Sequence, residues 1–290
     1  MKLMILVLIL SWLLQIGAPG PAGSRPLPPL DSFLQGIRSR LHSNRIVQSR
    51  YTYTERSISR QLDGDGNVKG TETRVYEVYP SLEEELTYRK LISKNDKPLT
   101  EEEIRKQDSA FDKKLREWGR KLERRKEKEA EALKKEEAAL DEAFRLYEIT
   151  MTGRESMGGI PVIGLAFAPH PGYRPMTDEG KILSKVRGRA WFGEADHELV
   201  RIEAELCGSL SFGLGVVAKL NQGARLVFER RRVNDEVWLP SMSRFTGTGK
   251  ILVLKGFRID QETLYSHYQK FSVETLSKIQ PPADAAEETP

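Results

Sequence analysis

Catalytic chemistry in this sequence would depend first on its histidines and serines. The four histidines are His42, His170, His197 and His267. No two of them have the H-x-x-x-H spacing that places two metal ligands on one helix face. The run from Gly208 to Gly213 contains serines but does not match the G-x-S-x-G nucleophile motif. We therefore predict a protein that is not an enzyme and holds neither metal nor cofactor; a hydrolase whose groups converge from distant segments is the alternative.

The Asp-Gly-Asp-Gly-Asn run from Asp63 to Asn67 has residues that could bind calcium. It departs from the calcium-loop template at two positions. Val68 stands where the loop needs a glycine, and Arg74 stands where it needs a bidentate glutamate. Asp, Gly and Asn are also the residues that tight turns favour. We therefore expect the turn of a β-hairpin at this run.

Cys207 is the single cysteine, so the sequence allows no intrachain disulfide. It lies far from the N-terminus and cannot be the lipidated cysteine of a lipoprotein. No histidine or basic cluster adjoins it in the sequence to activate the thiol. This pattern is typical of a small buried hydrophobic residue. An intermolecular or reactive thiol is the alternative.

The N-terminus has the pattern of a secretory signal peptide. Lys2 supplies a positive charge, an apolar run extends from Leu3 to Ile16, and small residues follow. We predict that residues 1–24 are the signal peptide, with cleavage after Ala22 or Ser24. A retained membrane anchor is the alternative, although a spanning helix needs about 20 apolar residues. The chain is thus expected to be exported, and to be soluble after cleavage.

The rest of the composition is that of a folded protein, with 39% hydrophobic and 30% charged residues. The net charge of +4 comes from plentiful acids and bases together, so we expect no nucleic-acid partner. Residues 25–30 are rich in proline and predict a linker. Residues 31–274 predict one domain, and the acidic residues 275–290 predict a disordered tail.

Two stretches have helical spacing. After Asp31, apolar residues including Phe33 and Ile37 share one face and predict a helix of about three turns. Thr100 and Glu103 form a capping box at the start of a second, much longer stretch, residues 100–144. Its length is about 40 residues, so the helix is expected to be bent or split in two. Its charged centre predicts a solvated, projecting face and a coiled-coil-like arm.

Most of the remaining chain has the two-residue period of β-strands. The expected strands cover residues 47–59, 68–79, 85–93, 147–152, 160–168, 185–192, 198–206, 216–220, 224–233, 237–248, 251–258 and 264–273. Short strands at regular spacing, joined by tight turns, indicate an antiparallel sheet or barrel. The fold class is therefore α+β, mainly antiparallel β.

Alternation along these strands predicts one apolar face. In residues 198–206, for example, Val200 and Ile202 point one way while Arg201 and Glu203 point the other. Strand parity gives a candidate apolar lining of Phe192, Val200, Ile202, Leu226, Phe228, Phe245 and Leu252. A sheet curled around helices would hold an apolar ligand against such a lining. Side chains that fill the space completely are the alternative.

Several segments together resemble a known family. They contain a strand-glycine-turn-strand unit, a hairpin with a tryptophan before an acidic turn, a W-L-P strand and a closing Y-x-x-Y-x-x-F strand. The segments are residues 147–155 with 160–162, residues 188–192 with 198–203, Val237 to Pro240, and Tyr265 to Phe271. In this order, over residues 34–273, the chain resembles the LolA/LolB-like outer-membrane lipoprotein-sorting (lipoprotein carrier) family.

The resemblance implies an incomplete, half β-barrel wrapped around helices, with an apolar cavity for acyl chains. It implies a periplasmic carrier of lipoproteins or another lipid, with a role in lipoprotein sorting, transport and outer-membrane biogenesis. The chain departs from the family in the helical insertion of residues 100–144. A non-enzymatic envelope sensor or protein-interaction module, docking through this charged arm, is therefore the alternative function. A structural envelope protein without a ligand is a third.

Overall fold

The computed structural model describes residues 25–40, 45–82, 84–119, 122–212, 218–251 and 255–271. The predicted signal peptide, the predicted tail, His42 and Leu252 lie outside these residues, so those predictions stay untested.

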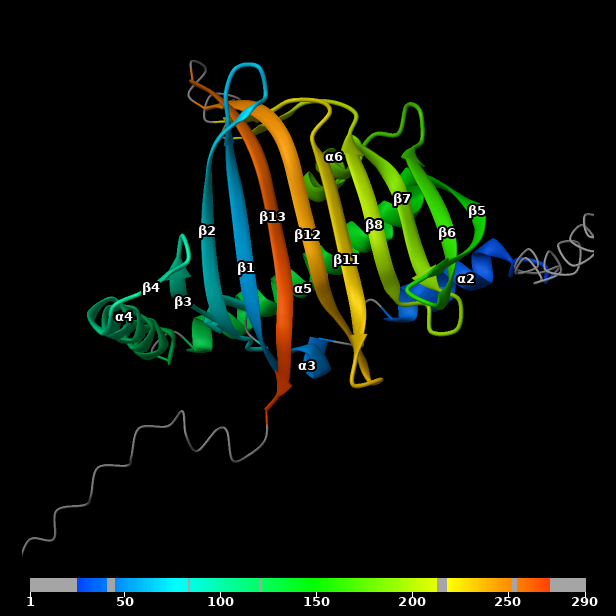
Figure 1. Ribbon diagram of the computed structural model, residues 1–290. Helices are drawn as coiled ribbons and strands as arrows, with labels where there is room; N and C mark the ends of the chain where they lie inside the picture. Colours follow the sequence, from blue (N-terminus) through cyan, green and yellow to red (C-terminus); the bar gives the residue numbers. More distant parts are fainter. Residues whose placement is uncertain are drawn as a thin grey trace, which may run out of the picture.

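The described strands form one antiparallel sheet of 13 strands (Figure 1). Their order in space is β4-β3-β2-β1-β13-β12-β11-β8-β7-β6-β5; the short β10 also pairs with β12, and β9 pairs with β10. The strands are β1 Tyr51–Leu62, β2 Val68–Tyr79, β3 Tyr88–Lys94, β4 Lys97–Pro98, β5 Tyr147–Met157, β6 Ile160–Pro169, β7 Val186–Gly193, β8 Leu199–Leu206, β9 Leu210–Phe212, β10 Ala218–Leu220, β11 Arg225–Val233, β12 Val237–Ile251 and β13 Lys255–Lys270.

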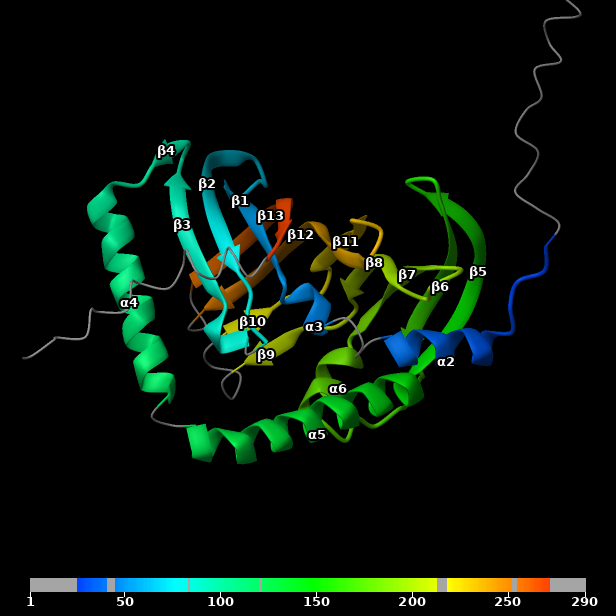
Figure 2. The ribbon, with the colours of Figure 1, turned by 90° about the horizontal axis from the view of Figure 1, so that it is seen from below.

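The sheet is not closed, because β4 and β5 end the strand order without pairing to each other. The predicted fold class, mainly antiparallel β with a few helices, is confirmed in these terms. The helices are α2 Leu30–Arg40, α3 Arg45–Gln48, α4 Glu101–Gly119, α5 Leu122–Leu146 and α6 Asp178–Leu183, with a 3-10 turn at Glu84–Leu86. Figure 2 shows the sheet curving over α5, α3 and α2. We call the face turned toward these helices the inner face.

Charged side chains cover the opposite, outer face. Arg201 pairs there with Glu203 and Glu229, and Arg60 pairs with Asp260 and Glu262 on strands farther along the sheet. Arg201 and Glu203 share β8, whereas the pairs with Glu229, Asp260 and Glu262 bridge neighbouring strands. Opposite charges on neighbouring strands stabilise a sheet face that water can reach. The outer face therefore needs no covering layer.

Helix α2 packs its apolar side on the inner face of the sheet. Phe33 and Ile37 are almost fully buried and form a core cluster with Ile163 and Leu165 of β6. Arg38, on the same helix, pairs with Asp141 of α5. The helix is thus fixed between the sheet and α5, at the β5 end of the strand order.

A buried carboxylate holds the C-terminal half of α5. Glu142 is fully buried, and its oxygens accept hydrogen bonds from the Met176 amide at 2.5 Å, the Thr177 amide at 2.9 Å and the Thr177 hydroxyl. Thr177 is also the N-cap of α6, and its hydroxyl accepts the Gly180 amide at 2.8 Å. One side chain therefore joins α5 to the loop that begins α6. Sequence periodicity did not predict α6, because one and a half turns are too short to show a helical period.

The capping box at Thr100 is confirmed. The Glu103 carboxylate accepts the Thr100 amide at 2.8 Å, and the Thr100 hydroxyl accepts the Glu103 amide at 3.3 Å. The structure divides residues 101–146 between α4 and α5. The Asp63–Asn67 run is a turn, as predicted, because the Asp63 carboxylate accepts the amides of Asp65 and Asn67 at 2.9 Å each.

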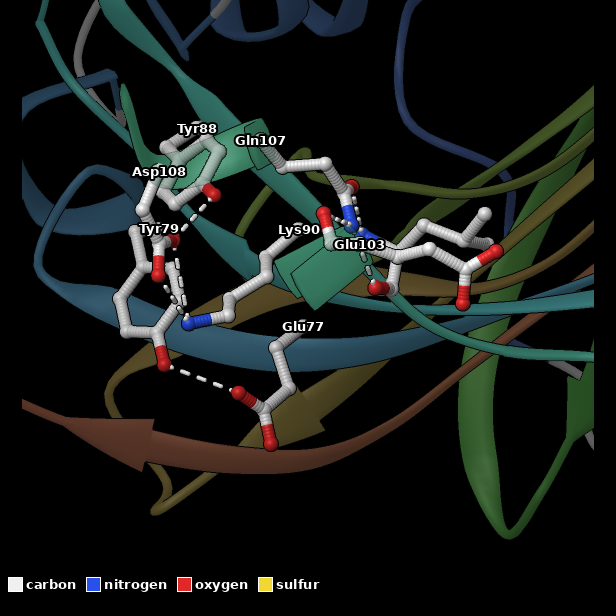
Figure 3. A network of polar contacts seen from close by, with 8 residues as sticks. Glu77, Tyr79, Tyr88, Lys90, Glu103, Gln107 and Asp108 are labelled. Carbon is white, nitrogen blue, oxygen red and sulfur yellow. Dashed lines mark hydrogen bonds and ion pairs between the residues drawn. The ribbon is translucent and has the colours of Figure 1, made fainter. Parts of the chain in front are cut away.

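Helix α4 is held against β3 by the polar network of Figure 3. The Gln107 amide group bonds both the N–H and the C=O of Leu91, at 3.0 and 3.1 Å, as a neighbouring strand would. Asp108 accepts from the Tyr88 hydroxyl at 2.6 Å and pairs with Lys90. Strand β4 covers only the far end of β3. The network therefore satisfies backbone groups that would otherwise be an open sheet edge.

The Glu142 contacts predict a specific pH dependence of stability. The hydrogen bond from the Thr177 hydroxyl, together with the Met176 amide, lowers the pKa of the Glu142 carboxyl in the folded state. A lowered folded pKa contributes stability above the unfolded pKa, and this contribution is lost as the pH falls through the folded value. We expect Glu142→Gln to lower the Tm at pH 7. The difference in Tm between the wild type and the variant should become smaller as the pH falls below about 4.

The measurement is thermal unfolding of both proteins between pH 7 and pH 3. The control is Glu148→Gln, at an exposed residue of β5, and we expect its Tm to equal that of the wild type at both pH values. A difference in Tm for Glu142→Gln that stays constant over this range would contradict the role assigned to the carboxylate.

Candidate ligand-binding face

The register of the strands places a set of apolar side chains on the inner face. Directly paired residues of an antiparallel sheet point to the same side. Two cross-strand rows run from the core residues of β6 toward β1. One row is Phe167–Gly188–Ala204–Leu226–Phe245–Gln261–Ser59, and the other is Leu165–Ala190–Ile202–Phe228–Ser243–Thr263–Ser57. The first row is apolar from β6 to Phe245 of β12 and the second from β6 to Phe228 of β11, and the remaining members of both rows are polar.

Small residues occupy the middle of these rows. Gly188, Ala190 and Ala204 occupy β7 and β8, between the larger side chains of β6 and β11. A Cβ atom at Gly188 would collide with the Glu203 carbonyl oxygen and the Phe167 ring. Glycine is therefore required at this position, because the Phe167 ring and the neighbouring backbone leave no room for a side chain.

Part of this surface remains accessible although it faces the helices. Leu226 is 39% exposed. Ile202, Phe228 and Phe245 are each half-buried, as is Ala204. We call these five residues the inner apolar patch. By contrast, Leu165 and Ala190 at the β6 side are buried, so the core ends where the patch begins.

The predicted lining residues divide between the patch and the core. Ile202, Leu226, Phe228 and Phe245 share the inner face and belong to the patch. Phe192 packs against the α2 core cluster, and Val200 is 7% exposed in a cluster with Trp191 and Trp238. The part assigned to each of them in ligand binding stays a prediction. Ala204 was missing from the predicted set, since its small side chain gives a weak parity signal.

An aromatic and polar zone borders the patch on β1 and β13. The Tyr53 ring lies 5.9 Å from that of Tyr265 and 5.3 Å from that of Tyr268. Burial raises the pKa of Tyr53 to about 12 and also raises the pKa of Tyr265 and Tyr268. These hydroxyls therefore stay protonated at neutral pH. A pocket of about 520 Å³, lined by Tyr53, Tyr268 and the half-buried Pro240, opens at this zone.

The same zone also contains an ion pair. Glu55, which is 8% exposed, accepts a bidentate contact from Arg89 of β3. The Arg89 guanidinium also lies 4.5 Å from the centre of the Tyr76 ring. The charge of Glu55 is thus compensated, and the zone presents aromatic surface and hydroxyls to the inner side.

A buried ion pair marks the other end of the patch. Arg230 of β11 donates to the Glu198 carboxylate at 3.1 Å and to the Trp238 carbonyl at 2.7 Å. The side chains of Arg230 and Glu198 are only 11% and 9% exposed. Burial lowers the pKa of Arg230, while the neighbouring Glu198 opposes that shift. Beyond this pair the strands run into the β7–β8 and β11–β12 turns.

No arrangement for metal binding occurs in the part of the chain that the structure describes. Within those ranges, no three His, Cys, Asp or Glu side chains lie so that they could hold a metal ion. His170, His197 and His267 lie on separate segments, and Cys207 is a free, half-buried thiol. Likewise, among the described residues, no helix has the length and apolar character needed to cross a membrane.

Comparisons with known proteins give similarities of structure. No protein-family model matches the sequence, and no curated protein matches it. A domain assigned to outer-membrane lipoprotein sorting from Vibrio parahaemolyticus has a TM-score of 0.32 and 10% identity, covering 86% of this chain and 96% of that chain. A DUF1329 family protein from Desulfovibrio piger has a TM-score of 0.28 and 13% identity, covering 84% and 94%.

MucB, solved in complex with MucA(peri), has a TM-score of 0.23 and 8% identity, with coverage of 82% of this chain and 94% of that chain. Since these TM-scores lie below 0.5, we base the function on the geometry of the inner face. Membership of the lipoprotein-sorting family stays a prediction.

The Arg230–Glu198 pair gives a testable prediction about stability. Removal of one partner of a buried pair leaves the other charge uncompensated, so Arg230→Gln should destabilise the protein by about 3 kcal/mol. Arg225, on the same strand, pairs with Glu205 at the outer face and is 68% exposed, so Arg225→Gln should cost less than about 1 kcal/mol. Urea unfolding measures both values. Equal destabilisation by the two variants would show that the Arg230 pair is not a buried, mutually dependent pair.

Proposed function

We propose that this protein is a non-enzymatic carrier of the periplasm that binds an apolar ligand on its inner face. The ligand class is the acyl chains of a lipoprotein or of another lipid. The observation that carries the proposal is the inner apolar patch, whose side chains remain partly exposed on the face turned toward the helices. In this proposal the chain works after export and removal of residues 1–24.

The shape of the patch suits an extended chain of methylene groups. Ala204 lies low between Ile202 and Leu226, while Phe228 and Phe245 stand beside it. Burial of acyl carbons contributes about 0.8 kcal/mol per methylene. Beyond Phe228 its row continues with the polar residues Ser243 and Thr263, so the apolar surface is bounded and the polar end of a lipid would lie outside it.

Release of the ligand is as necessary for a carrier as binding. The C-terminal half of α5 is fixed by Glu142 and by Arg38 of α2. The patch lies across β8, β11 and β12, away from those contacts. An acyl chain can therefore reach the patch without breaking the core, and binding at a partly exposed surface is weaker than binding in a closed cavity.

The proposal is tested by the affinity for a fatty acid and for a diacylated lipopeptide. A carboxylate placed in the patch must be desolvated when an acyl chain binds. Phe228→Asp should therefore weaken binding about tenfold or more, equivalent to about 1.4 kcal/mol. The matched control is Val227→Asp, which adds the same charge one residue away on the outer face and should leave binding unchanged.

A second variant distinguishes loss of the binding surface from unfolding, which Phe228→Asp could also cause. Ala204→Phe replaces the smallest side chain of the patch by a ring without adding charge, and it should also weaken binding while the thermal unfolding transition stays unchanged. Native mass spectrometry of the purified protein detects the bound lipid directly. Equal affinities in the wild type and all three variants, or no uptake of either ligand, would contradict the carrier function. The arm of α4 and α5, as a docking element for a protein, would then be the function to pursue.

A further inference from the structure

A pocket of about 780 Å³ lies beyond the Arg230–Glu198 end of the inner apolar patch. Its wall comes from segments that are distant in the sequence. The β5–β6 and β7–β8 turns form one side, and α2 with the residues before it forms another. Arg232 and Trp238, a cross-strand pair of β11 and β12, complete it. Strand parity alone did not reveal it, because turns and strand ends from four places in the chain meet there.

Two guanidinium groups of this wall lack a carboxylate partner among the described residues. Arg232 donates to the Asp235 carbonyl at 2.8 Å and takes part in none of the described ion pairs. Arg25 contributes its backbone carbonyl to Arg154, and its side chain forms no described ion pair. Both residues line the pocket. Arginine presents a planar set of donors that matches phosphate and carboxylate.

Both carboxylates of the wall accept hydrogen bonds, and among the described ion pairs Glu194 has a cationic partner, Arg154. Glu194 accepts a bidentate contact from Arg154, at 2.6 and 2.8 Å. Asp196 accepts the Trp238 indole N–H at 2.8 Å and the Glu198 amide at 3.1 Å. The hydrogen bond from Arg154 lowers the pKa of Glu194, and the charge of Arg25 contributes to the same shift, so Arg25 acts on this carboxylate. Asp196 keeps its negative charge, because both of its donors are neutral. With Arg154 included, three arginines stand against two carboxylates around the pocket, which leaves a net positive charge.

The pocket also has apolar walls. Phe33, Ile160 and Trp238 line it together with the His197 ring, which packs on Phe33 with ring centres 4.9 Å apart. Arg232 follows Phe228 of the patch by four residues on the same strand, a span of about 13 Å, and the register of β11 with β12 shifts between Glu229 and Arg230. Trp238, the partner of Arg232, packs with Val162, Trp191 and Val200. A ligand whose apolar chain lies on the patch must therefore extend past the Arg230–Glu198 pair to bring its polar end to this pocket.

From these observations we infer that the pocket is an anion subsite for the phosphate or carboxylate head group of the acyl ligand. Arg232 and Arg25 supply the charge, and Phe33 and Trp238 contact the first carbons of the chain. The inference rests on the proposed function for the position of the acyl chain. The charge of the pocket is independent of that function, since a free phosphate would satisfy the same arginines.

The test compares two lysolipids with the same acyl chain, one with an anionic phosphoglycerol head and one with a zwitterionic phosphocholine head. The purified protein should bind the anionic lipid about tenfold more tightly. Arg232→Gln should remove this preference and leave the affinity for the zwitterionic lipid unchanged, whereas Arg232→Lys should retain most of it. Arg225→Gln, which removes a positive charge from the outer face of the same strand, is the control and should keep the preference.

Each outcome decides between the two proposals. Equal affinities for the two lysolipids in the wild type, or a preference that survives Arg232→Gln, would overturn the anion subsite and leave the carrier function standing. Binding of neither lysolipid would contradict the carrier function. In that case a titration with inorganic phosphate, followed by phosphorus NMR, tests the subsite alone. Broadening of the phosphate resonance by the wild type but not by Arg232→Gln would support a free-anion site, and the absence of broadening with the wild type would overturn it.

Discussion

The two-residue period of the antiparallel strands fixes which chemistry lies on each face of the sheet. From β6 to β12, direct pairing keeps Leu165, Ile202 and Phe228 on one side and Arg201 and Glu229 on the other. A register slip of one residue would place these charges under the helices and the apolar side chains in water. The cross-strand ion pairs of the outer face and the α2 core cluster of the inner face both oppose such a slip.

The helices cover this sheet unevenly, and the proposed function depends on that. Phe33 and Ile37 of α2 complete the core at the β6 side, and Glu142 fixes α5 there. At the opposite edge, Gln107 of α4 satisfies the backbone of β3. Between these two attachments the apolar rows remain partly exposed. Under the proposed function, such a surface would bind an acyl chain through solvent exclusion and release it without unfolding of the core.

Much of the sheet could be predicted from the sequence, because alternation and turn residues are local signals. The Thr100–Glu103 capping box and the Asp63 turn are confirmed for the same reason. Helix α6 is short and depends on a contact from Glu142, which no local pattern shows. Parity placed Phe228 and Ile202 on one face, but it could not show that Val200 lies in the core, because that depends on side chains brought together by the fold. The pocket at Arg232 needed the tertiary structure.

The central claim is that an acyl chain lies on the inner apolar patch. Photo-crosslinking with a fatty acid that carries a diazirine in mid-chain, followed by peptide mass spectrometry, tests it most directly, because the label reports position as well as binding. We predict adducts concentrated on β8, β11 and β12, at Ile202, Phe228, Phe245 and their inner-face neighbours, and competition by unlabelled fatty acid. Adducts on outer-face residues such as Val227, or adducts that unlabelled fatty acid does not reduce, would contradict the account.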